Sequence, residues 1–174
     1  MPKDIMPIQV NPIRFAENGV TMHGSLFIKD MQRLGVSLAG QEGEVKVDLE
    51  FGIDREKTRF VKGHFETALT LQCQRCLENF IQEVVGDLKS GLVNNEKEAN
   101  ALSSRYEPLI VVDNNLVIQD MIEDELILTL PIVPMHDLKD CSIQLPQAAG
   151  DAEMTEFKKE SPFKVIEHLK KEVG

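Results

Sequence analysis

The fold is expected to be organised around the stretch Leu71-Gln72-Cys73-Gln74-Arg75-Cys76-Leu77. This Cys-x-x-Cys stretch holds two of the three cysteines of the chain and lies between two strand-like segments. A second stretch, Leu130-Pro131-Ile132-Val133-Pro134-Met135-His136-Asp137, is followed by Cys141. Two thiols on a short turn, with a histidine and a thiol on a distant loop, are the ligand set of a tetrahedral zinc site. The pattern predicts a metal centre that joins two loops.

Three interpretations of Cys73 and Cys76 are open on the residues alone. A thioredoxin-type redox pair requires a helix whose N-terminus lowers the pKa of the first thiol, whereas Leu77-Glu78-Asn79-Phe80-Ile81 has the character of a strand. A zinc half-site suits a tight turn, because Zn–S bonds of about 2.3 Å need two converging sulfurs. Two unligated cysteines at a hairpin end are the third interpretation. His136 and Cys141 favour zinc, since one site then accounts for all three cysteines.

The segments around the Cys-x-x-Cys turn predict antiparallel strands. Between Gly43 and Val93, apolar residues alternate with polar ones, which is the pattern of half-buried strands. Two of these strands are expected over 60–71 and 80–92, and a further strand over 106–112. Because consecutive strands are joined by short turns, we expect an antiparallel, partly closed, barrel-like sheet.

The strongest helical pattern covers 116–130 and ends at Pro131, which cannot continue a helix. Glu123 falls on its polar side, whereas Glu125 projects into the apolar stripe. A carboxylate among apolar neighbours costs several kcal/mol unless it is paired, so its pKa rises or a cation contacts it. We expect Glu125 to form a buried ion pair, with Arg75 as the candidate partner, or to reach the helix edge; a catalytic base is the alternative. The apolar stripe is expected to consist of Ile118, Met121, Ile122 and Leu126.

The remaining segments are expected to be irregular or extended. Three prolines within 2–16 indicate an extended segment at a sheet edge. The polar interval 94–105 is expected to be a mobile surface loop, and 144–161 a polar linker before a C-terminal helix that Ser161-Pro162 opens. The sequence therefore predicts one α+β domain over 1–174, with the sheet flanked by a few helices.

Composition narrows the partners and the compartment. The net charge is −10, from 19 Lys+Arg against 29 Asp+Glu, and an acidic body repels the phosphates of DNA or naked RNA. A basic partner such as a ribosomal protein fits this charge, although solubility alone explains it equally well. The sequence contains no apolar run of about 18 residues, so no membrane-spanning helix is expected. The odd cysteine count and the lack of a signal-peptide pattern predict a cytoplasmic protein without a membrane partner.

Motifs of conventional enzymes are absent from the sequence. It has no phosphate-binding glycine loop, no Gly-x-Ser-x-Gly and no helical His-Glu-x-x-His. Tryptophan is absent and there is one tyrosine, so few side chains are available to stack on single-stranded RNA. We therefore expect a protein that is not an enzyme.

Several motifs occur in a characteristic order along nearly the whole chain. They are Asn11-Pro12, 71–76, Tyr106-Glu107-Pro108, 121–137, and Ser161-Pro162-Phe163 with Leu169-Lys170. In this order they closely resemble the YceD-type large ribosomal RNA subunit accumulation proteins. The resemblance implies a bacterial cytoplasmic factor needed for the synthesis, processing or stability of large-subunit ribosomal RNA, and it implies no catalytic residues. Relatives are richer in cysteine after the Pro-x-x-Pro stretch, where this chain has His136 and Cys141.

We therefore predict a non-enzymatic factor for accumulation of large-subunit ribosomal RNA. It would offer surfaces to the large-subunit precursor, to a ribosomal protein, to a processing enzyme or to the RNA itself. One structural zinc would be held by Cys73, Cys76, His136 and Cys141. The alternatives are a metal-assisted RNA-processing enzyme with Glu125 as base, and a zinc-stabilised protein-binding adaptor unrelated to ribosomes.

Overall fold

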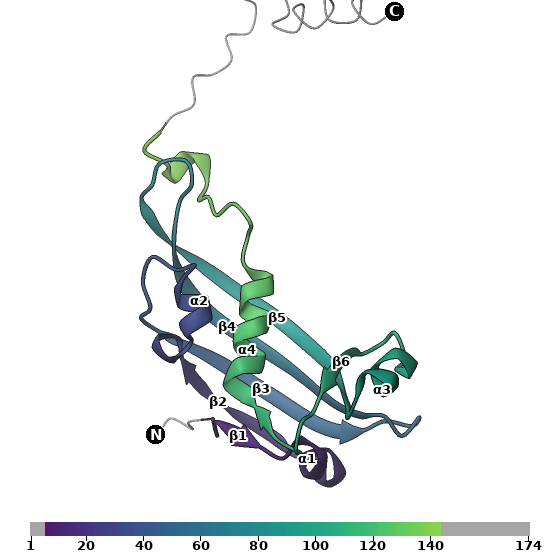
Figure 1. Cartoon of the computed structure of the whole chain (residues 1–174). Helices are drawn as coiled ribbons and strands as arrows, with labels where there is room; N and C mark the ends of the chain where they lie inside the picture. Colours follow the sequence, from purple (N-terminus) through teal and green to yellow (C-terminus); the bar gives the residue numbers. More distant parts are fainter. Residues whose placement is uncertain (1–5, 144–174) are drawn as a thin grey trace, which may run out of the picture. The chain divides into compact units, whose positions relative to one another are not determined.

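A five-stranded sheet forms the centre of the computed structural model, which describes residues 6–143 (Figure 1). Its neighbours follow the order β2-β3-β4-β5-β6, so β2 and β6 are edges and the sheet is open. The expected barrel-like closure is therefore not found in this part of the chain. The strands are β2 (Thr21–Phe27), β3 (Glu44–Ile53), β4 (Arg59–Gln72), β5 (Asn79–Val93) and β6 (Glu107–Ile110).

The predicted antiparallel pairing is confirmed for β2 through β5. β6 differs, because it runs parallel to β5. Its connection from β5 contains helix α3 (Glu96–Ala101), and a crossover of this kind lets the chain return in the same direction. The interval 94–105 lies at the surface as expected, but it folds this short helix, which Asn95 caps through a bond from Glu98 N.

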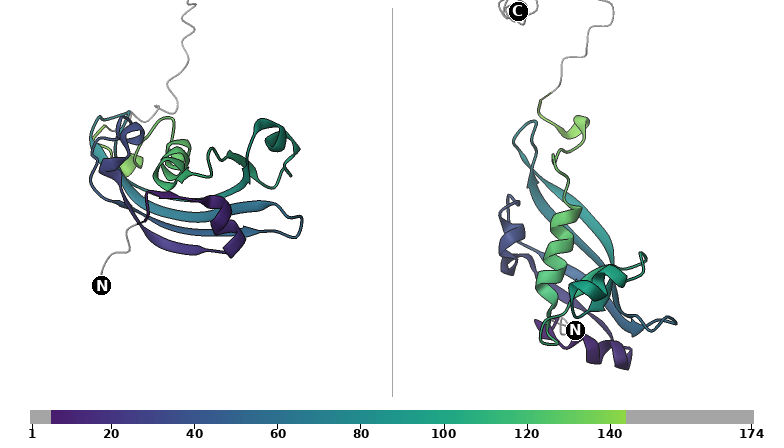
Figure 2. Two further views of the ribbon diagram at one scale, coloured as in Figure 1. Left: turned by 60° about the horizontal axis from the view of Figure 1, so that its bottom comes forward. Right: turned by 45° about the vertical axis from the view of Figure 1, so that its right-hand side comes forward.

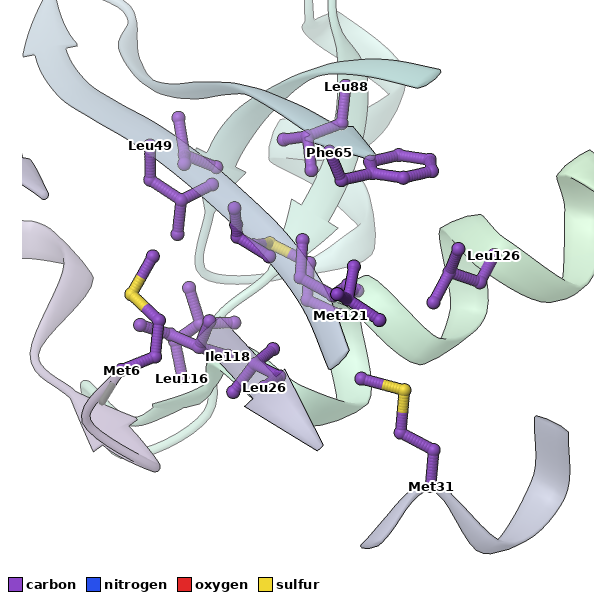
Figure 3. Close-up of a cluster of buried hydrophobic side chains, with 14 of the residues drawn as sticks. Met6, Leu26, Met31, Leu49, Phe65, Leu88, Leu116, Ile118, Met121 and Leu126 are labelled. Atoms are coloured by element: carbon purple, nitrogen blue, oxygen red, sulfur yellow. The ribbon is translucent and has the colours of Figure 1, made fainter. Parts of the chain in front are cut away.

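Helix α4 (Ile118–Thr129) lies across one face of the sheet, as the views in Figure 2 show. Its predicted apolar side is confirmed, because Ile118, Ile122 and Leu126 are fully buried. Alternate strand residues such as Leu49 and Phe65 face this side of the sheet and complete the hydrophobic core (Figure 3). The opposite faces of the strands carry exposed charged residues, which gives the alternation seen in the sequence.

Glu123 was expected on the polar side of α4, and this expectation is wrong. Only 3% of the residue is exposed. Its Oε1 accepts the backbone N–H groups of Arg33 and Leu34 at 2.7 and 2.9 Å, at the short helix α2 (Gln32–Gly35). Its Oε2 accepts from Arg33 Nε at 3.1 Å. The carboxylate is buried because it supplies partners that the start of α2 would otherwise lack.

The N-terminal part is only partly extended. β1 (Gln9–Val10) pairs with β7 (Leu116–Val117), but Pro12–Asn18 forms helix α1 and not an extended segment. Asn11 caps this helix by accepting the N–H of Arg14 at 3.0 Å. Proline is favoured at a first helical position because its fixed φ is already helical. Gly19 ends the helix with a left-handed φ of 60°.

Two single-turn helices complete the described elements: η1 (Ile28–Asp30) and η2 (Leu138–Asp140). The predicted polar linker 144–161 and the helix after Ser161-Pro162 lie outside the described residues, so the extent of the single domain stays a prediction. Within residues 6–143, none of the helices combines the length and the apolar character needed to cross a bilayer.

Candidate metal centre

The Cys-x-x-Cys turn closes the hairpin between β4 and β5, as predicted. Cys73 N donates to Glu78 O at 2.9 Å, and Leu77 N donates back to Cys73 O at 2.8 Å. Leu77 adopts a left-handed φ of 64°, which lets the chain reverse tightly around Cys73. Because β5 follows the turn, no helix is available to activate a thioredoxin-type thiol.

The second loop reaches the turn after α4 ends. Gln74 N donates to Pro134 O at 2.9 Å, so the loop is attached to the turn by its backbone. The 3-10 turn η2 then directs the chain so that Cys141 is buried. Pro131 stops the helix, and the irregular segment that follows spans the distance to the hairpin end (Figure 1).

The four predicted residues come together at this point. The ligand atoms of Cys73, Cys76, His136 and Cys141 all lie within 4.8 Å of one another. Cys76 Sγ and His136 Nε2 are 3.1 Å apart, and the three cysteines are free thiols. A zinc tetrahedron with bonds of about 2.0 to 2.3 Å has edges of roughly 3.3 to 3.8 Å. A small contraction of the longest separation would therefore place all four atoms around one ion.

The imidazole of His136 is held in an orientation that suits a ligand. Its Nδ1 lies 3.2 Å from the backbone oxygen of Asp137, and its ring packs edge-on against Phe80, with 5.3 Å between the ring centres. With the proton on Nδ1 donated to that oxygen, the lone pair of Nε2 is free to face the three thiols.

Electrostatics at the centre favours deprotonated sulfur. Burial of the Cys73 thiol raises its pKa, but hydrogen bonds from the backbones of Cys76, Arg75 and His136 outweigh this effect and lower it from 9.0 to about 6. Arg75 donates from Nε to Cys141 Sγ at 3.0 Å and from its terminal nitrogen to His136 O at 2.8 Å. The bond with Cys141 also raises the pKa of Arg75. A guanidinium against several thiols offsets the charge that thiolate ligands would bring together.

The predicted ion pair between Glu125 and Arg75 is wrong, because Arg75 belongs to the Cys/His cluster. Glu125 is half-buried, and no ion pair joins it to another residue within 6–143. It lines a separate cleft beside Tyr106 and Glu107. Burial raises its pKa, and the neighbouring charges of Glu107 and Asp124 raise it further. Helical periodicity gave the direction of this side chain but not its neighbours, which come from distant segments.

Arg75 is the residue of the centre whose role the sequence did not reveal. Its place inside the Cys-x-x-Cys turn was a usable signal, since a cation between two thiols is well placed to bind a third one. Its contact with Cys141 depends on the folded second loop, which lies 66 residues further along the chain.

The fold and this cluster define an α+β protein with a Cys/His centre whose donor atoms suit a soft divalent metal. The chain belongs to the family described as large ribosomal RNA subunit accumulation protein YceD, which matches residues 61–170. A Haemophilus influenzae protein with the same name is 31% identical over 172 residues, covering 98% of this chain and 99% of the relative. No solved structure matches significantly. The family resemblance noted in the sequence is thereby confirmed.

Proposed function

We propose that this chain is a non-enzymatic factor that supports the accumulation of large-subunit ribosomal RNA. The observation that carries the proposal is the match, over 98% of the chain, to a protein named for that role. The charge of −10 agrees with a partner that presents basic protein as well as RNA. The chain would therefore bind a large-subunit precursor through a surface that includes ribosomal protein.

We further propose that the Cys/His cluster holds one structural zinc. Four protein ligands, namely three thiols and one imidazole, fill a tetrahedron and leave no open position for substrate or water. Metal would attach the loop after α4 to the β4–β5 hairpin, so its contribution would be to stability. Protein purified without chelator is expected to contain about one zinc per chain. Cys73→Ser should abolish this zinc content, and a metal-free wild-type protein that is fully folded would contradict the proposal.

The metal-assisted enzyme remains a weaker candidate for this geometry. Glu125, its proposed base, lines a cleft that none of the four cluster residues helps to form. Glu125→Gln is expected to leave ribosomal RNA accumulation unchanged. It should also stabilise the protein modestly at neutral pH, by less than about 1 kcal/mol, because it removes a half-buried charge beside two other carboxylates. Loss of RNA processing with intact folding would instead favour catalysis.

Depletion of the protein followed by ribosomal RNA profiling tests the main proposal. We expect a deficit of large-subunit RNA that the wild-type gene restores. A normal profile after depletion would favour the adaptor unrelated to ribosomes. For the partner, binding to native precursor particles should be tighter than binding to protein-free precursor RNA at physiological salt. Equal affinities would contradict a protein-containing surface.

A further inference from the structure

Strand β5 extends far beyond the neighbour on one of its sides. Antiparallel β4 pairs with it from Asn79 to Gly91, whereas parallel β6 pairs only with Ser90–Val93. Figure 1 shows β6 beside one end of β5 only. On the β6 side, residues 79–89 therefore form a sheet edge that β6 does not cover. Such an edge is a template for another strand.

Whether a β5 residue points its backbone N–H and C=O groups toward β4 or toward the β6 side depends on whether its number is odd or even. Val93 O accepts the N–H of Val111 at 2.8 Å on the β6 side. Successive residues of a strand present their N–H and C=O groups to alternate sides, and the β4–β5 register runs without a break. The residues that face the free edge are therefore Ile81, Glu83, Val85, Asp87 and Lys89.

Strand β4 gives independent evidence that the odd-numbered residues of β5 point their backbone groups away from β4. Thr70 O accepts from Ala39 N at 2.8 Å, on the side of β4 that faces away from β5. Thr70 stands opposite Ile81 in the register. Their pair therefore exchanges no backbone hydrogen bonds, and the groups of Ile81 point outward from the sheet.

Within residues 6–143, and outside the ladder that begins at Ser90 and Glu107, one hydrogen bond reaches the backbone groups of this edge. Glu83 O accepts from Gln82 Nε2 at 2.9 Å, a contact from the adjacent side chain. The side chains on the outer face include exposed charges, which commonly protect sheet edges from unwanted pairing. Here the charges alternate with exposed apolar residues, because Ile81 is 71% and Val85 is 58% exposed. A row of backbone N–H groups without partners in residues 6–143, beside exposed apolar side chains, favours an edge that binds a strand over an edge that charges protect from pairing.

The charges near the edge define the chemistry of its occupant. Glu83 and Asp87 project from the outer face of β5, and a cleft of about 260 Å³ at the β6 end of the edge is lined by Asp87, Glu107 and Glu125. The two cations of that cleft have other contacts. Arg105 forms an ion pair with Glu56 at 2.7 Å, and the Lys89 ammonium lies 4.9 Å from the centre of the Tyr106 ring. Asp87 Oδ1 already lies 2.8 Å from His64 Nδ1, whereas no ion pair within residues 6–143 joins Glu107 or Glu125. These two carboxylates therefore favour an incoming cation.

We propose that the free edge Ile81–Lys89 receives an extended basic segment of a partner protein as an added strand. Its backbone bonds with the odd-numbered residues of β5, its apolar side chains contact Ile81 and Val85, and its lysine or arginine side chains face Glu83 and the cleft carboxylates. Main-chain bonds would supply affinity, and alternate side chains would supply selectivity. The inference rests on the proposed function, for which it names the chemistry of the partner.

Amide hydrogen exchange of the full-length protein tests the backbone part of the proposal. The probe is a synthetic nine-residue peptide, blocked at both ends, in which every second residue is alternately valine and lysine and the residues between them are threonine. Valine and lysine then lie on the same face of the added strand, as Ile81, Glu83 and Val85 do on β5. We expect its addition to slow exchange at Ile81, Val85 and Lys89 at least tenfold, and to leave Val84 and Leu88 unchanged. A glutamate-for-lysine peptide should bind at least tenfold more weakly. Equal slowing of exchange at the odd- and even-numbered amides of β5, or no slowing at either, would overturn the proposal.

Two matched pairs of variants test the edge itself. Val85→Pro removes an outward N–H but no ladder bond, which edge strands tolerate, and should weaken peptide binding at least tenfold. Val85→Ala keeps the N–H and should change affinity less than threefold. Glu83→Lys should weaken binding about fivefold to tenfold. Glu42→Lys makes the same charge change in the exposed segment before β3 and should have no effect. Unchanged binding by Glu83→Lys would overturn the proposal even if Val85→Pro failed to fold.

A second copy of the chain is the competing occupant. Sedimentation of the peptide-free protein over a hundredfold concentration range is expected to show monomers. Dimers whose formation protects the odd-numbered amides would overturn the proposal in favour of self-pairing.

Complementation separates this inference from the proposed function. In depleted cells, wild-type protein should restore large-subunit RNA, whereas folded Glu83→Lys should restore it less than Glu42→Lys. Equal restoration by both variants would overturn the inference and leave the proposed function standing. Failure of the wild type itself would overturn the proposed function.

Discussion

Replacement of Glu123 by alanine is expected to lower the free energy of unfolding by about 3 to 5 kcal/mol. Glu123 is 3% exposed, and its Oε1 accepts two backbone N–H groups, those of Arg33 and Leu34. Each buried donor that loses its partner costs about 1 to 3 kcal/mol. The side chain of Arg33 is 52% exposed, so water can replace its contact with the carboxylate. The two orphaned N–H groups therefore account for most of the loss.

A comparison of three variants tests how the loss divides between the two backbone N–H groups and the Arg33 side chain. Glu123→Gln keeps an oxygen for the two N–H groups but places an amide donor against Arg33 Nε, so we expect a loss of about 1 to 3 kcal/mol. Asp124→Asn weakens the exposed pair with the same arginine and should cost less than about 1 kcal/mol. Urea denaturation of the full-length protein, followed by far-ultraviolet circular dichroism, measures each change. A loss below about 1 kcal/mol for Glu123→Ala would mean that the two N–H groups do not depend on this carboxylate.

Three further predictions concern the core, the turn and the thiols. Leu126→Ala and Ile122→Ala should each destabilise by roughly 2 to 5 kcal/mol, because both residues are fully buried; a loss below about 1 kcal/mol in urea denaturation would contradict this. Leu77→Gly should stabilise by about 0.5 to 1 kcal/mol, because it relieves a φ of 64° at an exposed position; a lower thermal midpoint would argue against it. In metal-free protein, folding lowers the pKa of Cys73 from 9.0 to about 6. The free energy of unfolding of the wild type should therefore exceed that of Cys73→Ser above pH 9, and this difference should decline as the pH falls toward 6. Urea denaturation with chelator across this range measures the difference, and a difference that does not change with pH would contradict the prediction.

Much of the fold was predictable because it depends on near neighbours in the sequence. The strands on both sides of the Cys-x-x-Cys turn and the helix before Pro131 follow from alternation and helical periodicity, which act over a few residues. Helix α1 was predictable by the same means, since Asn11, Pro12 and Gly19 are its cap signals. The extended interpretation gave too much weight to the prolines.

The four residues of the Cys/His cluster could be grouped from residue chemistry alone. Thiol and imidazole groups that share no other evident role suggest one site. The folded chain confirms that they meet, within 4.8 Å. The sequence did not reveal that Arg75 joins them, because its partner Cys141 reaches the turn only through the path of the second loop.

Glu123 and Glu125, two residues apart in α4, separate what local periodicity dictates from what depends on long-range packing. The sequence determined that a helix forms there and which way each side chain projects, because these follow from 3.6 residues per turn. It did not determine that Glu123 is buried and Glu125 half-exposed. The backbone N–H groups that bind Glu123 lie about ninety residues away, in α2. The parallel pairing of β6 and the free edge of β5 likewise depend on how the crossover through α3 packs in the folded chain. Helical periodicity fixes the direction in which a side chain projects from the helix. The energy of a buried charge depends instead on which distant hydrogen-bond donors the fold brings to it.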